Sequence, residues 1–170
     1  MKKTNLLTVN ALIAAIYTVL TLGLPVVSFG AIQFRLSEAL CMLPAIFPQS
    51  VLGLTIGCFL SNLLGAVMGV NPLGFIDSVF GTLATLIAAV VLLKIAPFVK
   101  NNIIKLVVFP LPAVLFNGII IGAELAFLTL TFSWQSFFSF FGVIALSEAV
   151  VCYIFGNLLI FLLKDKIKTR

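Results

Sequence analysis

Apolar stretches separated by short polar connections run through the whole chain, and each stretch predicts a helix. The chain length allows about six helices of about 20 apolar residues, the length needed to cross a bilayer core. The second stretch is short and contains Pro44, with Pro48 just beyond it. Because proline weakens or ends a helix, we expect this stretch to be the least regular and to lean or pack inside the bundle. The six stretches cover residues 6–27, 36–47, 51–70, 73–96, 106–130 and 137–163.

Composition places these helices in a membrane. Hydrophobic residues make up 62% of the chain and charged residues 9%, and 17 of the 170 residues are phenylalanine. A soluble domain of this size could not bury that much apolar surface. The expected fold class is an all-α membrane protein, with residues 1–170 forming a single integral membrane domain that crosses the cell membrane several times.

The basic residues predict an orientation in the membrane. Lys and Arg in short loops are enriched on the cytoplasmic side. Six crossings that begin inside place nine of the ten basic residues in the cytoplasm and leave only Arg35 outside. We therefore expect six transmembrane helices with both termini cytoplasmic, and we attribute the positive charge to topology and not to a nucleic-acid partner.

Four carboxylates lie inside the apolar stretches, namely Glu38, Asp77, Glu124 and Glu148. A charge at the bilayer centre costs about 2.5 kcal/mol or more, so ionisable groups there usually face a cavity and a partner. Four such groups in one small chain indicate a ligand pocket. With Arg35, they are the charged candidates for substrate binding.

The expected depths of these acids agree. A basic residue near the inner end of each helix lies 16 residues from Glu148, 17 from Asp77 and 19 from Glu124. At 1.5 Å per helical residue they lie about 24, 26 and 28 Å above the inner interface. All three reach the outer third of a core about 30 Å thick, and Glu38 begins its helix just after the outer loop. The predicted site therefore faces outward.

Structural roles compete with this interpretation. Glu124 and Glu148 could each satisfy a neighbouring helix, because polar residues join transmembrane helices. Asp77 could cap the N-terminus of the fourth helix. Arg35 lies three residues before Glu38, close enough for an ion pair on one face in which the two residues neutralise only each other.

Uncharged residues add weaker candidates. Asn62 and Asn117 lie within the membrane, where Asn more often joins helices than binds ligands. The cysteines form no C-x-x-C pair and are interpreted as buried packing residues, and because the chain has no His, no metal site is predicted. The three cysteines are Cys41, Cys58 and Cys152.

Small residues at a spacing of four let helices approach closely. Ala11 and Ala15 have this spacing near the cytoplasmic end of the first helix, where they could present a flat face to a partner or pack within the bundle. Glycine pairs of the same kind occur at 53 and 57, 65 and 69, and 118 and 122.

Motifs for catalysis are missing from the sequence. It contains no G-x-x-x-x-G-K-[ST] phosphate loop, no G-x-S-x-G and no H-E-x-x-H. We therefore expect no enzyme and no cofactor in this chain. A binding protein or a transporter subunit fits better.

Four sequence blocks carry a family resemblance. Residues 32–40 read IQFRLSEAL, residues 53–58 read GLTIGC with Asn62 following, residues 77–85 read DSVFGTLAT, and Glu148 is followed by Cys152 and Tyr153. These blocks closely resemble the QueT family over nearly the whole chain. Cys41 departs from the small polar residue expected there.

The resemblance implies a fold and partners. QueT proteins are similar to the substrate-binding S components of energy-coupling factor (ECF) transporters. It implies a six-helix S-component bundle, a transmembrane T component and two cytoplasmic ATPases that use ATP. Ala11 and Ala15 then look like the motif with which S components dock on the T component.

The implied ligand is a queuosine precursor, a 7-deazaguanine such as preQ1 or preQ0. Its N1–H and 2-amino donors suit a carboxylate, and its carbonyl oxygen suits Arg or Asn. Four acids against one Arg favour the aminomethyl cation of preQ1 over the neutral nitrile of preQ0. The base should stack on Phe34, Phe75 or Trp134, and the loop 28–34 is the expected lid.

Two alternatives remain open. Intramembrane carboxylates are equally expected in a stand-alone ion- or proton-coupled carrier of a small cationic solute. The chain could also be an S component for another vitamin, because a fold does not define a function.

Overall fold

The apolar stretches form helices in the computed structural model, which describes residues 3–29, 32–129 and 132–168. All regular elements in these ranges are helical. In chain order they are α1 (Lys3–Leu22), α2 (Pro25–Ser28), η1 (Leu36–Ala45), α3 (Ser50–Val67), α4 (Phe75–Ile95), η2 (Ala96–Phe98), α5 (Asn102–Val108), α6 (Leu111–Leu128), α7 (Trp134–Val150), η3 (Val151–Gly156) and α8 (Asn157–Lys168).

Five segments are long and apolar enough to cross a membrane. The remaining predicted helix, the second along the chain, is η1, a 3₁₀-helix of 10 residues. At about 2.0 Å per residue it is about 20 Å long, which is too short for a core of about 30 Å. The all-helical membrane architecture is therefore confirmed, whereas six spanning helices are not found in the described ranges. The five spans are Thr4–Leu22, Ser50–Val67, Phe75–Phe98, Asn102–Leu128 and Trp134–Lys164.

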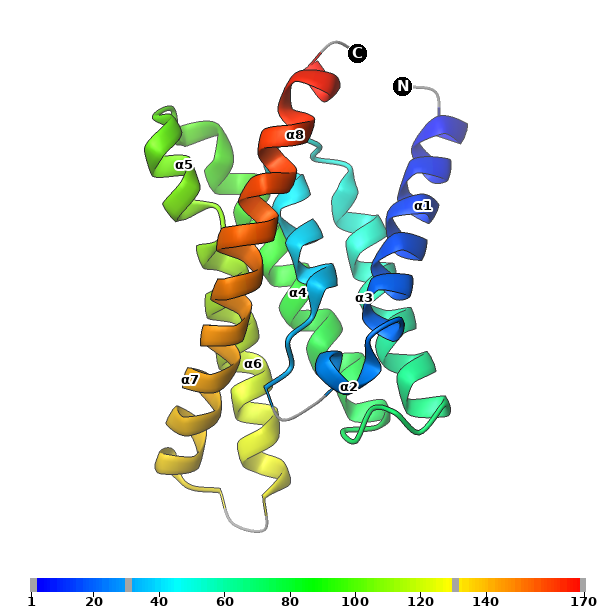
Figure 1. Ribbon diagram of the computed structural model, residues 1–170, viewed down its shortest axis with the longest axis vertical. Coiled ribbons are helices and arrows are strands. Elements are labelled where there is room, and N and C mark those ends of the chain that lie inside the picture. Colours follow the sequence, from blue (N-terminus) through cyan, green and yellow to red (C-terminus); the bar gives the residue numbers. More distant parts are fainter. Residues whose placement is uncertain (1–2, 30–31, 130–131, 169–170) are drawn as a thin grey trace.

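The short helix η1 lies inside the bundle, as its prolines indicated. Figure 1 shows it in light blue in the middle of the molecule, and it packs against α1, α4, α8 and η3. Its approach to η3 is close, because a Cβ atom added to Gly156 would lie 2.6 Å from Cγ of Met42. Polar residues on η1 are therefore carried into the interior of the bundle.

The fifth predicted helix is divided in two. It was expected to run from residue 106, but α5 ends at Val108 and the spanning α6 begins at Leu111. Pro110 and Pro112 explain the break, since proline is tolerated only in the first turn of a helix. Glu124 lies 13 residues into α6, or about 20 Å from its start. The distance from Lys105 to Glu124 is therefore not the rise of one continuous helix.

Both ends of the chain lie on one side of the bundle. Figure 1 shows α1 beginning and α8 ending at the same end, where α5 also lies. The short helix α2 lies at the opposite end.

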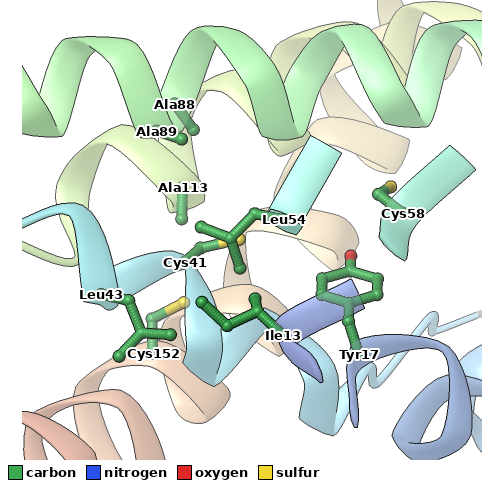
Figure 2. Packing of buried hydrophobic residues seen from close by; sticks show 10 residues of the cluster. All are labelled: Ile13, Tyr17, Cys41, Leu43, Leu54, Cys58, Ala88, Ala89, Ala113 and Cys152. Atoms are coloured by element: carbon green, nitrogen blue, oxygen red, sulfur yellow. The ribbon is translucent and has the colours of Figure 1, made fainter. Parts of the chain in front are cut away.

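Small and sulfur-containing side chains fill the core between the helices. Figure 2 shows Ala88, Ala89 and Ala113 facing the interior with Cys41 of η1 and Leu54 of α3. All three cysteines are free and buried, in agreement with their interpretation as packing residues. The small side chains allow η1 to fit between the longer helices.

Glycine allows α1 to pack closely against α3. A Cβ atom at Gly57 would lie 2.7 Å from Cβ of Tyr17 and 3.0 Å from the backbone of Ala14. Nearby, Oδ1 of Asn10 accepts a hydrogen bond of 2.7 Å from the free N–H of Gly53 in the first turn of α3. Gly53 and Gly57 therefore allow close helix packing within the bundle.

The α1–α3 contact makes the first prediction. Gly57→Ala should lower the free energy of unfolding by about 1–3 kcal/mol, because the backbone of Ala14 cannot move aside easily. Gly142→Ala is the control, since a Cβ there meets nothing within 4 Å. Thermal unfolding in detergent measures both. Equal stability of the two variants would contradict the close packing.

Candidate functional site

Arg35 and Asp77 form a buried ion pair at the end of the bundle opposite α5. Nη2 of Arg35 lies 2.7 Å from Oδ2 of Asp77, and the two residues are 5% and 0% exposed. Oδ2 of Asp77 also accepts a hydrogen bond of 2.8 Å from Nδ2 of Asn71. Nε of Arg35 donates to the backbone oxygen of Ser28 at 3.1 Å. The pair therefore joins the segment before η1 to the start of α4.

The alternative in which Arg35 and Glu38 neutralise only each other is wrong. Arg35 precedes η1 in an extended conformation, with φ −96° and ψ 103°, and its ion pair is with Asp77. Asp77 lies in the first turn of α4, but its side chain does not cap the helix. Its Oδ2 accepts from Arg35 and Asn71, and its Oδ1 has no partner among the described residues.

Glu38 is bound to α1 and to its own helix. One carboxylate oxygen accepts a hydrogen bond from the hydroxyl of Tyr17. The other accepts from Sγ of Cys41 at 2.9 Å. One turn along α1, the hydroxyls of Thr21 and Ser37 are 2.7 Å apart. These bonds hold η1, and with it Glu38, against α1.

Glu148 joins α7 to α6. Its Oε1 accepts a hydrogen bond of 3.1 Å from Nδ2 of Asn117. Cys152 lies one turn on, in the π-helical segment η3, and its Sγ is 3.7 Å from the same oxygen. π-helical turns occur frequently at functional sites. Glu148 thus joins two helices and also belongs to the polar cluster.

A small cavity lies between these groups and has a volume of about 10 Å³. This is room for about one water molecule. Gln33 at the cavity has a positive φ of 48°, which is uncommon for a residue other than glycine. Seven residues line the cavity: Gln33, Arg35, Glu38, Asn117, Ile121, Ile144 and Glu148.

Glu124 and Asn62 do not line the cavity. Glu124 is buried, and neither of its carboxylate oxygens has a hydrogen-bond partner among the described residues. Nδ2 of Asn62 donates to the backbone oxygen of Asp77 at 3.0 Å, so Asn62 joins α3 to α4 as intramembrane Asn often does. Oδ1 of Asn62 has no partner in the described part of the chain.

The aromatic candidates lie in different places. Phe34 is half-buried next to Arg35, whereas Phe75 and Trp134 are 62% and 69% exposed. Trp134 contacts Phe132 and Phe137 at the start of α7, an arrangement typical of a membrane-interface anchor. None of the three lines the cavity.

Several residues around the polar cluster were not identified from the sequence. Phe29 is buried, and its ring centroid lies 5.2 Å from Cζ of Arg35. Tyr17, Gln33 and Asn71 are isolated polar residues without a charge, so they do not stand out in the sequence. A signal was present only for Tyr17, which follows Ile13 by four residues on the buried face of α1.

A larger cavity of about 740 Å³ lies at the other end of the bundle. Lys100, Lys105 and Lys164 line it, together with residues of η2, α5 and α8. It contains none of the predicted site residues. The polar cluster and this basic cavity are therefore separate features.

The structure brings together charged and polar residues from the segment before η1 and from η1, α4, α6 and α7, as the agreement of depths predicted. These features define a multi-pass membrane protein with a polar site inside its helical bundle.

Comparison with known proteins specifies the family. The family model of the QueT transporter matches residues 7–165, so the chain belongs to the QueT transporter family. A protein of Lactococcus lactis subsp. cremoris (strain MG1363), named queuosine precursor transporter QueT, is 37% identical over 79 residues. The alignment covers 45% of this chain and 43% of the relative, less than half of each. No solved structure matches the chain. The resemblance to the QueT family is confirmed, and the chain is a multi-pass membrane protein of this family.

The buried ion pair makes the second prediction. Asp77→Asn should lower the free energy of unfolding by about 3–5 kcal/mol, because it leaves the Arg35 charge buried without a counter-ion. The double variant Arg35→Met with Asp77→Leu should recover most of this loss. Unfolding by SDS titration measures both, with Asp165→Asn as the matched control. A double variant as unstable as Asp77→Asn would show that the ion pair is not the cause.

Proposed function

We propose that the protein is the substrate-specific S component of an ECF importer, and that it binds a 7-deazaguanine from outside the cell. In this proposal the end of the bundle with Arg35 and Asp77 faces outward. The opposite end, which carries Lys100, Lys105 and Lys164, faces the cytoplasm, in line with the enrichment of basic residues there. The name of the Lactococcus relative supports the choice of a queuosine precursor.

The observation that carries this proposal is the set of groups at the small cavity. Two carboxylates, Glu38 and Glu148, meet Arg35 and Asn117 there. A guanine edge presents N1–H and a 2-amino group side by side, which a carboxylate accepts as a pair. The base carbonyl next to them needs a donor, which Arg35 or Asn117 supplies. Acceptors for the N1–H and 2-amino groups and a donor for the carbonyl oxygen are therefore available in one place.

The cavity must expand before it can hold a base. A volume of about 10 Å³ has no room for a bicyclic ring. Gln33 lines the cavity in a conformation that is costly for its residue type. Of the predicted lid 28–34, Gly30 and Ala31 lie outside the described residues. In our proposal, displacement of Gln33 opens the cavity and offers Phe34 as a stacking partner.

Delivery of the ligand is proposed to require partners. Ala11 and Ala15 are exposed on α1, while Ile13, Ala14 and Tyr17 on its other face are buried. The small-residue spacing is thus not used within the bundle and leaves a flat face for a second membrane protein. We assign this face to the T component, whose two ATPases hydrolyse the ATP.

The third prediction tests the ligand. The purified chain should bind preQ1 or preQ0 in calorimetric titration, and it should not bind riboflavin. Glu148→Gln should weaken binding about 10- to 100-fold, because the variant loses a charge-assisted acceptor worth about 1.5–3 kcal/mol. Asp165→Asn, which neutralises the fifth acid of the chain outside the proposed site, should leave the affinity unchanged.

Two other outcomes would redirect the assignment. Riboflavin binding without deazaguanine binding would identify an S component for another vitamin. Uptake of a cationic solute by vesicles that contain this chain alone, driven by a proton or sodium gradient, would identify a stand-alone carrier. The ECF proposal requires that such vesicles take up nothing without the ATPases.

The fourth prediction tests the docking face. Ala11→Trp and Ala15→Trp should abolish co-purification with the T component and its ATPases, because a bulky ring separates helices that pack through small residues. Ligand binding by the isolated chain should persist. Leu146→Trp is the matched control, since Leu146 is 69% exposed on α7. Complex formation by both alanine variants would exclude this face as the docking site.

A further inference from the structure

Glu124 differs from the other three intramembrane acids. Asp77 has Arg35 and Asn71 as partners, and Glu38 and Glu148 accept hydrogen bonds from neutral donors. Both oxygens of Glu124 lack a partner among the described residues, although the residue is only 4% exposed. An unpaired buried carboxylate is costly, and such a group in a native structure calls for an explanation.

Asp77 and Asn62 also have unused acceptors. Oδ1 of Asp77 and Oδ1 of Asn62 are buried and have no hydrogen-bond partner in the described ranges. A Cβ atom at Gly81 would lie 2.6 Å from Nδ2 of Asn62, 2.9 Å from Oδ1 of Asp77 and 3.6 Å from Nη1 of Arg35, so donor groups lie beside these two side chains. Glu124 is the buried acid for which no donor is found among the described residues.

A buried carboxylate without donors matches one kind of ligand group. A primary ammonium carries three N–H donors and no acceptor. A carbonyl or a nitrile would find no donor on Glu124. Asp77 is already paired with Arg35, and Glu38 and Glu148 already accept hydrogen bonds, so Glu124 is the acid whose two oxygens are both left for a cation.

The position of Glu124 relates it to the small cavity. Asn117, Ile121 and Glu124 follow one another at spacings of four and three, so they share one face of α6. Asn117 and Ile121 line the cavity, and Glu124 lies one turn further along the helix. From Asn117 to Glu124 the helix rises about 10 Å. This separation is comparable to the length of a bicyclic base with its 7-substituent.

We propose that Glu124 forms a subsite for the primary ammonium of the ligand. This subsite rests on the proposed function, since it accepts the aminomethyl group of a 7-deazaguanine whose guanine edge is held by Glu38 and Glu148. It makes Glu124 the residue that selects the cationic precursor over the neutral one.

The test compares two ligands that differ in this one group. Calorimetric titration of the full chain with preQ1, which has the ammonium, and preQ0, which has a nitrile, should show tighter binding of preQ1. Glu124→Gln should weaken preQ1 binding about 10- to 100-fold and change preQ0 binding less than about 3-fold. Glu148→Gln is the matched control and should weaken both ligands alike, because both present the same guanine edge.

Stability separates this role from a structural one. Glu124→Gln removes an unpaired charge, so its thermal unfolding midpoint without ligand should equal or exceed that of the wild type. A structural role predicts a lower midpoint. Glu124→Leu, which also removes the charge, should give the same loss of preQ1 preference and serves if the Gln variant cannot be purified.

The outcomes distinguish the two proposals. If the wild type binds both bases and Glu124→Gln weakens both equally or neither, the ammonium subsite is wrong while the proposed function stands. If the wild type binds neither base, the proposed function fails, and the subsite fails with it.

Discussion

The ion pair between Arg35 and Asp77 is the constraint on which the arrangement of the site depends. It places a basic residue of the segment before η1 against the first turn of α4, at 2.7 Å and nearly without exposure. A buried charge of either sign alone would cost several kcal/mol, so neither residue can leave the other without a replacement. The pair thereby holds the segment that carries Gln33 over the small cavity.

A second set of bonds connects the site to the helix proposed to meet the partner. Tyr17 and Thr21 on α1 bond to Glu38 and Ser37 on η1. The opposite face of α1 carries the exposed Ala11. η1 is too short to span the membrane. Its position therefore depends on these side-chain bonds more than the position of a long helix would. The same contacts therefore hold both Glu38 at the site and α1 in place.

The two ends of the bundle have opposite chemistry. Four acids and Arg35 occupy the interior towards one end, whereas the cavity of about 740 Å³ at the other end is lined by three lysines. The first end is nearly closed, with a cavity of about 10 Å³. Under the proposed function, the polar end must open to admit a ligand, as the small volume of its cavity requires.

Sequence reasoning succeeded where chemistry acts along a single helix. The apolar stretches predicted the membrane class and the helices, and Pro44 and Pro48 predicted a short irregular η1. Each of these inferences needs only helical rise, helix-breaking residues and the cost of charge in a bilayer. The break at Pro110 was missed because the apolar stretch continues through it.

Partner choice between helices was beyond such reasoning. Arg35 pairs with Asp77, 42 residues away, and not with Glu38, although both Arg35 and Glu38 line the small cavity. The partner of Glu38 is Tyr17 of another helix, and Glu124 is left without one among the described residues. Helical spacing relates neighbours three or four residues apart, whereas contacts between helices depend on how each helix is rotated and placed. Packing in three dimensions therefore decides which acid is satisfied and which is left for a ligand.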